Sequence, residues 1–481
     1  IHKLEVKLKQ HTPLIHFQHD QEGATLRASE VKPKLDRFII SKLGDENYES
    51  FPDDEYETMI AAYEINTGKV YDELDIDQQC FELGKFIANK KGWFIGSGEH
   101  LALAYRMKIT PDTKSESIFL KTEPRTNSRN ETKYYSYWVN DGRKEEFPLL
   151  LSNMGGKDSE DDLCNLNKYN YVSLIFSSSN KQLIAFIRET ASLFFARRNF
   201  GQRQDKGFGS FSVVGIDGVA VSFPKLSGVR FMEFEYEYSD TIYYYAKLFS
   251  VIDFYWKCLK SGINYTQDRK YPWRYIKAYL WKYLNDKEKQ TWEKRSIKEF
   301  FHLTTGNERP ENPHPASFAR ALLGCPDKFE YKQQGKTINI HHSASPDRDS
   351  FIARIPSPIV FKPIIENNIV RIYIIPDASA IKQLSKQNNL TFLFEGTGQM
   401  ELDVNPQSID LESLLRGYHQ YIEKQKFGEK AFVDNNGTLI ESEYEKFREK
   451  NCPEDLGQWF VPLDFKWKRI INSPVRLYIQ R

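Results

Sequence analysis

The order of apolar patterns in the N-terminal half constrains the fold of this chain most strongly. Residues 3–9 alternate charged and apolar side chains, which is the period of a strand with one buried and one solvated face. Apolar residues recur at helical spacing over 31–39 and again over 180–196, so each stretch predicts an amphipathic helix. Further strands are predicted at 101–109, 171–176 and 211–214. The order is therefore strand, helix, strand, strand, helix, strand.

A single antiparallel sheet with both helices on one face accommodates this order, and that is the ferredoxin-like arrangement of many RNA-recognition domains. In the first helix, Ser29 is expected to act as the N-cap, which places Pro33 in the first turn. The polar stretch 111–165 fits none of the predicted elements, and we interpret it as an insertion.

A second cycle of the same pattern begins near residue 229. A strand at 229–238 and an aromatic-rich helix at 241–259 are followed by strands at 337–342, 359–362 and 370–375 and by a helix at 378–387. We therefore predict an α+β protein with two tandem ferredoxin-like (RRM-like) domains and insertions, the first at 1–224 and the second at 225–404. The C-terminal extension 405–481, either separate or part of the second domain, has helical stretches at 411–424 and 441–450 and a strand-like end at 475–480.

Composition excludes several classes of protein. The 481 residues include 67 Lys and Arg against 66 Asp and Glu, so the formal charge of +1 gives no global sign of nucleic-acid binding, and any basic surface must be local. The five cysteines lie far apart with no pair at metal-ligand spacing, so no metal or cofactor is predicted. No run of 18 apolar residues and no signal-like start is visible, and we expect a cytoplasmic protein without a membrane partner.

The segment from Phe200 to Ser210 carries the strongest local signal, because three glycines and two cations occupy one turn between an apolar helix and a strand. Glycine permits positive φ and lets backbone N–H groups approach a phosphate, while Arg and Lys side chains supply charge. The stretch 196–210 holds four basic residues and one acidic residue. Its spacing matches neither the P-loop nor the dinucleotide-binding motif, so a nucleotide cofactor is not expected. A ligand-free turn from helix to strand is the alternative.

A second basic segment spans 257–299, with twelve basic residues against five acidic ones. Aromatic side chains are interleaved with the cations, a combination that binds single-stranded RNA by base stacking and phosphate contact. The alternative is a helix whose aromatic face is core, with Tyr279 and Tyr283 on one stripe. In both interpretations the candidates for RNA contact are Arg269, Lys270, Arg274 and Lys277.

Several segments of the chain resemble a known protein family. A helix followed by a glycine-rich loop that ends Lys206-Gly207-Phe208-Gly209-Ser210, in front of a strand, resembles the signature loop of the RAMP superfamily of CRISPR-associated proteins. The segments 8–14 and 26–38 are similar to the first strand of that superfamily and to its first helix, which carries Arg and Ser. Residues 318–324 and 353–363 resemble the segments around the Ser-Pro-hydrophobic-Lys strand of type III subunits.

The resemblance implies ferredoxin-like folds and a place in a multisubunit complex directed against foreign RNA. Two tandem halves with the glycine loop near the middle are most similar to the two-domain capping subunit of the type III-B Cmr effector complex. We therefore expect an RNA-binding subunit in antiviral defence, with guide or target RNA and other effector subunits as partners and without catalysis of its own. Its predicted RNA groove is lined by Arg27, Ser29, Lys32, Lys34, Arg37, Arg197, Arg198, Gly201, Gln202, Arg203, Lys206, Gly207, Gly209 and Ser210.

Two other functions stay open. The guide-processing endoribonucleases of this superfamily use a general acid/base, often His, and the candidates here are His11 and His16. These two would lie on opposite faces of a strand without a cluster of Cys or carboxylate residues, so polar histidines at a strand end are the more frequent case. A scaffold that contacts only neighbouring subunits is consistent with the near-zero net charge and the abundant aromatic residues.

Overall fold

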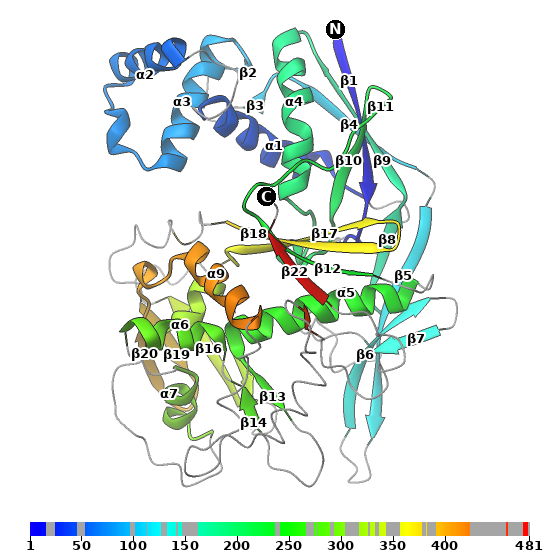
Figure 1. Ribbon diagram of the computed structural model, residues 1–481, viewed down its shortest axis with the longest axis vertical. Helices are drawn as coiled ribbons and strands as arrows, with labels where there is room; N and C mark the ends of the chain where they lie inside the picture. Colours follow the sequence, from blue (N-terminus) through cyan, green and yellow to red (C-terminus); the bar gives the residue numbers. More distant parts are fainter. Residues whose placement is uncertain are drawn as a thin grey trace.

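The computed structural model contains two ferredoxin-like sheets with helices and further sheets inserted between their strands, which confirms the predicted fold class (Figure 1). The structure describes residues 1–15, 25–45, 53–96, 102–112, 114–126, 132–140, 143–146, 162–235, 241–265, 274–276, 278–288, 293–303, 317–325, 328–331, 336–342, 356–377, 381, 391–423, 458–459 and 475–479.

The first sheet and its two helices consist of β1 (His2–Gln10), α1 (Ala28–Leu43), β4 (Arg106–Pro111), β9 (Tyr171–Ser178), α4 (Lys181–Arg197), β10 (Phe211–Ile216) and β11 (Val219–Ala220). The strand order is β11-β10-β1-β9-β4, and every neighbouring pair is antiparallel. Helix α1 connects β1 to β4 and α4 connects β9 to β10, so the four main strands have the ferredoxin-like order. Val6 of β1 is buried in one core with Leu35 of α1 and Leu183 of α4.

The second sheet repeats this topology with β12 (Arg230–Glu235), α5 (Thr241–Trp256), β17 (Ile359–Glu366), β18 (Ile369–Pro376), α9 (Leu411–Glu423), β21 (Gln458–Trp459) and β22 (Val475–Ile479). Its order is β17-β18-β12-β22-β21, again antiparallel throughout. Helix α5 follows the first strand of this sheet, and α9 lies between β18 and β22 in the sequence. The strand predicted at the end of the chain therefore pairs with β12, at the centre of the second sheet.

We call the first sheet with α1 and α4 the first unit, and the second sheet with α5 and α9 the second unit. Insertions extend both units. The stretch between β4 and β9 forms a separate antiparallel sheet, ordered β7-β6-β5-β8. Another sheet, ordered β15-β16-β19-β20, combines two strands that precede β17 in the sequence with two that follow β18. These strands are β5 (Lys114–Thr126), β6 (Thr132–Asn140), β7 (Arg143–Glu146), β8 (Asp162–Tyr169), β15 (Lys328–Tyr331), β16 (Lys336–His342), β19 (Thr391–Glu395) and β20 (Gln399–Asp403). The smaller inserted elements are α2 (Asp53–Thr67), α3 (Ile76–Lys90), β2 (Phe94–Ile95), β3 (Ala102–Leu103), β13 (Ile263–Tyr265), β14 (Arg274–Ile276), α6 (Tyr279–Glu288) and α7 (Glu293–Phe300).

Helix α1 differs from its prediction at the N-terminus. It begins at Ala28 with Arg27 in extended backbone at the N-cap, and no side chain caps it. The predicted cap, Ser29, lies inside the first turn, because the amides of Glu30 and Val31 already bond the Arg27 carbonyl. Pro33 lies one turn into the helix. The helices predicted at 378–387 and 441–450 lie outside the described residues, apart from Ile381.

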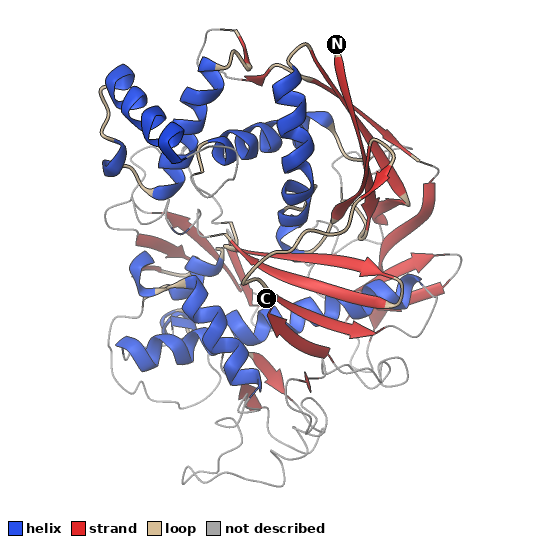
Figure 2. Ribbon diagram, turned by 45° about the horizontal axis from the view of Figure 1, so that its top comes forward, coloured by secondary structure: helices blue, strands red, loops and turns tan. Residues whose placement is uncertain are grey.

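The two units pack against each other through apolar side chains. In Figures 1 and 2 the first sheet with α1 and α4 lies above the second sheet with α5. Phe208, between α4 and β10, belongs to the same buried cluster as Phe249 of α5 and Phe361 of β17. A second cluster joins Ala196 of α4 to Tyr373 of β18. The turn that follows α4 is therefore a part of the contact between the units.

Candidate nucleic-acid interface

The glycine-rich loop, residues 199–210, leaves the end of α4 and returns to the start of β10. Its first and last residues, Asn199 and Ser210, form an antiparallel bridge that closes the neck of the loop. Gly201, Gly207 and Gly209 all have positive φ, between 63° and 92°. A side chain at Gly209 would overlap the Phe200 carbonyl oxygen, so the close approach of the two loop strands requires glycine there.

Helix α1 lies beside this loop, as the sequence predicts. The Glu30 carboxylate accepts a hydrogen bond from the Gly201 amide at 2.8 Å and from Lys34 Nζ at 2.9 Å. Lys34 Nζ also donates to Gln204 Oε1 at 3.0 Å. The start of α1 and the tip of the loop are therefore joined by polar contacts that include one carboxylate and one ammonium group.

The glycine amides do not form the phosphate cradle that the sequence suggests. The Gly201 amide donates to Glu30, the Gly209 amide donates to Pro13 O at 2.8 Å, and the Gly207 amide donates to Gln204 O at 3.4 Å. These donors are occupied within the protein because the loop packs on both its neighbours. The three glycine amides are therefore not available to an external phosphate.

Of the predicted RNA ligands, those that reach the surface lie along α1 and around the loop. Arg27, at the N-cap of α1, is exposed, as are Ser29 and Arg37 within α1. Arg197 and Arg198 are exposed at the end of α4. Gln202 and Arg203 are half-buried at the loop tip, and Arg203 has a left-handed backbone with φ 55°. The Arg37 guanidinium also lies 5.4 Å from the ring centroid of Phe81 on α3.

Two predicted ligands turn inward instead. Lys32 Nζ donates to Asp36 at 3.0 Å and to Leu103 O at 2.9 Å, and it lies 3.6 Å from the ring centroid of Tyr105. Burial lowers the pKa of Lys32, although Asp36 opposes this shift. The structure thus uses the lysine stem and charge in the contact between α1 and β3.

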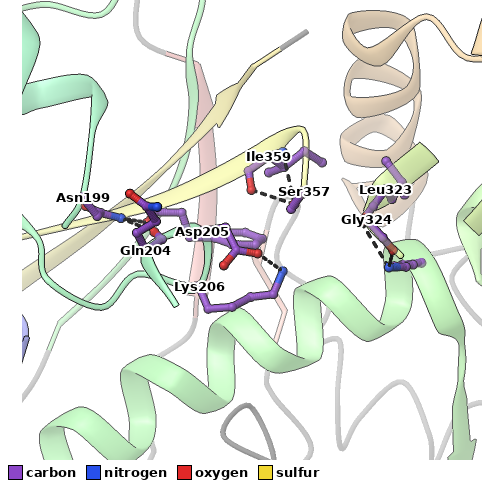
Figure 3. Close-up of polar contacts among 10 residues, drawn as sticks. Asn199, Gln204, Asp205, Lys206, Leu323, Gly324, Ser357 and Ile359 are labelled. Carbon is purple, nitrogen blue, oxygen red and sulfur yellow. Dashed lines mark hydrogen bonds and ion pairs between the residues drawn. The ribbon is translucent and has the colours of Figure 1, made fainter. Parts of the chain in front are cut away.

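Lys206 is the second inward cation. Its ammonium group pairs with Asp205 at 2.9 Å and lies 3.6 Å from the ring centroid of Trp256 in α5, with 12% of the side chain exposed. Figure 3 shows this ion pair above α5, beside the Asn199 side chain that donates to Gln204 O. Lys206 therefore contacts the second unit by a cation–π interaction.

The loop is buried after Lys206, and Phe208 packs against the second unit, a contact that the prediction of an RNA-binding loop does not include. Gly207, Phe208, Gly209 and Ser210 are all buried. The rings of Phe208 and Phe249 stack with 4.0 Å between centroids and 10° between planes. The sequence contains a signal for this packing, because Phe208 is a large apolar residue between two glycines. Exposing such a side chain to water is unfavourable, so burial is expected.

In the second basic segment, the core alternative is correct for the aromatic stripe. Tyr279 and Tyr283 of α6 are less than 10% exposed and belong to the large apolar cluster around α5. Their rings are therefore not available to stack on RNA bases. Of the four predicted cations, Arg269, Lys270 and Lys277 lie outside the described residues, and Arg274 is described only as part of β14.

The histidine alternative depends on His11, since His16 lies outside the described residues. His11 is 1% exposed. Its Nδ1 accepts the Ile365 amide at 3.0 Å, and its Nε2 lies 2.8 Å from Ser212 Oγ. Both ring nitrogens thus contact protein groups, one of them across the contact between the two units. Within the part of the chain that the structure describes, no three His, Cys, Asp or Glu side chains are grouped to hold a metal ion.

No helix among the described residues is long and apolar enough to cross a membrane. A comparison with curated proteins gives no match. Among solved structures, the chain is similar to one in the cryo-EM structure of the type III-B Cmr-beta complex bound to cognate target RNA, with 11% identity over 86% of this chain and 99% of that chain and a TM-score of 0.35. The chain is also similar to the crystal structure of Cmr1 from Pyrococcus furiosus in its apo form. The identity is 10% over 78% of this chain and 88% of that chain, with a TM-score of 0.29.

Family models give the assignment. The model of the Cmr1 N-terminal domain matches residues 1–263, and the model of the Cmr1 C-terminal domain matches residues 275–444. The first match alone covers more than half of the 481 residues, and the boundary between the two lies within the elements inserted after α5. The chain therefore belongs to the Cmr1 family, a result that confirms the predicted relation to Cmr proteins.

Proposed function

We propose that this chain is an RNA-binding subunit of a type III-B CRISPR effector complex, without catalysis of its own. Membership in the Cmr1 family supports the place in the effector, with guide or target RNA and other subunits as partners. The observation that carries the RNA-binding proposal is the junction of α1 and the glycine-rich loop. There, the contacts of Glu30 with Gly201 and of Lys34 with Gln204 join two distant segments, each of which carries exposed cations.

The proposed RNA contacts are side-chain contacts to phosphates and sugars. Arginine forms bidentate hydrogen bonds with phosphate oxygens, whereas serine and glutamine contribute neutral donors. Such an interface binds the backbone without reading base sequence, which suits a protein that must accept many guides. The residues assigned to it are Arg27, Ser29, Lys34, Arg37, Arg197, Arg198, Gln202 and Arg203, while Lys32, Lys206 and the glycines shape the surface from within.

The test compares two double variants that remove the same charge from different places. Arg198→Ala with Arg203→Ala removes one cation just before the loop and one at its tip. Arg106→Ala with Lys108→Ala removes two exposed cations from β4 at the far edge of the first sheet. Binding of labelled single-stranded RNA is measured by fluorescence anisotropy at several salt concentrations. Each phosphate contact contributes about 0.7 to the slope of log K against log salt for single strands, so the loop variant should lose about 1.4.

An unchanged slope in the loop variant, or an equal loss in the β4 variant, would remove the loop from the RNA interface. The same reactions are analysed for cleavage of an RNA that carries a CRISPR repeat. Cleavage by the purified protein would contradict the non-catalytic assignment and favour the endoribonuclease alternative. Absence of RNA binding by the unaltered chain alone and with its partner subunits would favour the scaffold alternative.

A further inference from the structure

The neck of the glycine-rich loop is held from outside by one lysine of the second unit. Lys362 lies in the middle of β17 and is 0% exposed. Its Nζ donates to Arg198 O at 2.8 Å and to Phe211 O at 2.6 Å. Arg198 precedes the bridged pair Asn199 and Ser210, and Phe211 follows it. A single side-chain nitrogen therefore donates to both chain segments where the loop begins and ends.

The bridged pair returns these hydrogen bonds to the same strand. Asn199 Nδ2 donates to Phe361 O at 2.7 Å, and Ser210 Oγ donates to Pro363 O at 2.6 Å. The residues on either side of Lys362 thus receive one side-chain donor from each side of the neck. This reciprocal set of four hydrogen bonds fixes the neck in position on β17.

The charge of Lys362 has no ionic partner among the residues that the structure describes, since its hydrogen-bond acceptors are two backbone carbonyls. Burial without a compensating carboxylate lowers the pKa of this lysine well below its usual value. An apolar residue of similar length would fill the site without this desolvation cost. An apolar residue, however, cannot donate hydrogen bonds. A long side chain with several donors can bond to both segments of the neck at the same time.

We propose that Lys362 is a positioning residue for RNA binding. It ties the neck of the glycine-rich loop to the second unit and so holds Arg198, beside the neck, and Arg203, at the loop tip, in their binding arrangement. This inference rests on the proposed function of the loop. The side chain itself is buried and does not touch RNA. Its effect on RNA affinity passes through the placement of Arg198 and of the loop tip that carries Arg203.

The test replaces the ammonium group and keeps most of the aliphatic stem. Lys362→Met is compared with Lys336→Met, which removes the bond from Lys336 Nζ to Phe301 O at 3.0 Å within the second unit. RNA affinity and its salt slope are measured at a temperature where both variants are fully folded by circular dichroism. Lys362→Met should bind RNA about tenfold more weakly and lose slope, as for the loss of two phosphate contacts, while Lys336→Met should stay within about twofold of the unaltered chain.

A double-mutant cycle separates positioning from a general loss of stability. In the Arg198→Ala, Arg203→Ala background, Lys362→Met should weaken RNA binding by less than about twofold, because the side chains it positions are already absent. A full additional tenfold loss, or no loss in the unaltered background, would overturn the inference. If the two arginine substitutions alone have no effect, the proposed function of the loop fails independently.

If Lys362→Met does not fold, Ser210→Ala provides the second variant. It removes only the bond to Pro363 O and leaves the Lys362 contacts in place. It should weaken RNA binding by about threefold in the unaltered background and by much less in the arginine background. Equal losses in the two backgrounds would contradict the positioning role.

Discussion

Phe208 of the glycine-rich loop stacks face to face on Phe249 of α5, with 4.0 Å between the ring centroids. Both rings are fully buried, so this pair connects the two ferredoxin-like units through their shared apolar cluster. The loop that we assign to RNA binding is therefore also a structural contact between units. A change at its buried end should affect the stability of the whole chain, and a change at its half-buried tip should affect it much less.

Phe208→Ala should lower the free energy of unfolding by about 3–5 kcal/mol, the range for removing a buried Phe ring. Urea denaturation followed by tryptophan fluorescence measures this loss. The control is Phe300→Ala, because Phe300 is 45% exposed and its removal should cost less than about 1 kcal/mol. Similar losses for the two variants would show that the Phe208 stack does not stabilise the contact between units.

The main helices and strands could be predicted from the sequence because the spacing of their apolar residues matches the face that each element buries. The spacing over 180–196 predicts a helix, and α4 spans Lys181–Arg197 with the Asn180 side chain as its N-cap. Helix α2 gives no such signal, since Tyr63 is the only buried residue among its described side chains. Helix α2 is therefore absent from the sequence prediction. Helix α3 is absent too, although its capping box at Asp75 and Gln78 and its buried Leu83 and Ile87 are signals that the sequence contains.

Gly207→Ala should destabilise the chain more than Gly218→Ala does. Both glycines have positive φ, 92° and 80°, so the backbone strain of about 1–2 kcal/mol is common to both substitutions. A Cβ at Gly207 would lie 3.0 Å from Ile252 Cδ1 and from Pro363 Cγ, whereas a Cβ at Gly218 meets no atom within 4 Å. The difference between the two losses should be about 1–3 kcal/mol, as for overpacking, and thermal or urea denaturation measures it. Equal losses would mean that the contact with Pro363 adapts freely.

The sequence predicts which segments form the candidate site, but it does not predict which of their side chains point outward. Lys32, Lys206 and Arg203 look alike in a count of charges, yet the first two cover aromatic rings inside the protein. The role of Lys362 depends on carbonyl groups more than 150 residues earlier in the chain. In the sequence, Lys362 lies within the apolar run of β17 and in the segment 353–363 that resembles the Ser-Pro-hydrophobic-Lys strand, and neither sign tells which backbone groups it meets.

His419 predicts a pH dependence of stability. It is 4% exposed, its Nε2 lies 2.8 Å from the Tyr255 hydroxyl, and burial, with a smaller contribution from Arg230, lowers its pKa to about 3. In the unfolded chain its pKa is near 6.5, so between these values the unfolded state binds a proton that the folded state does not. Stability should therefore fall as the pH falls from about 6.5 toward 3, by up to about 1.4 kcal/mol per pH unit from this residue.

His419→Gln keeps an acceptor for Tyr255 and removes the titration. Urea midpoints at several pH values between about 7 and 4 should show a flatter decline for this variant than for the unaltered chain. Parallel declines would show that other groups account for the whole acid sensitivity.

Lys206→Ala should affect stability and leave the salt dependence of RNA binding unchanged. The side chain is 12% exposed, its charge is paired with Asp205, and its ammonium group lies over the Trp256 ring, so it is not presented to an external phosphate. Loss of the cation–π contact and of the packed stem should cost about 1–2 kcal/mol of unfolding free energy. Arg203→Ala, at the loop tip, should give the opposite result, with a slope reduced by about 0.7 and little change in stability. A reduced slope for Lys206→Ala would mean that RNA draws the lysine away from Trp256, and the surface assigned here would then extend along the loop to α5.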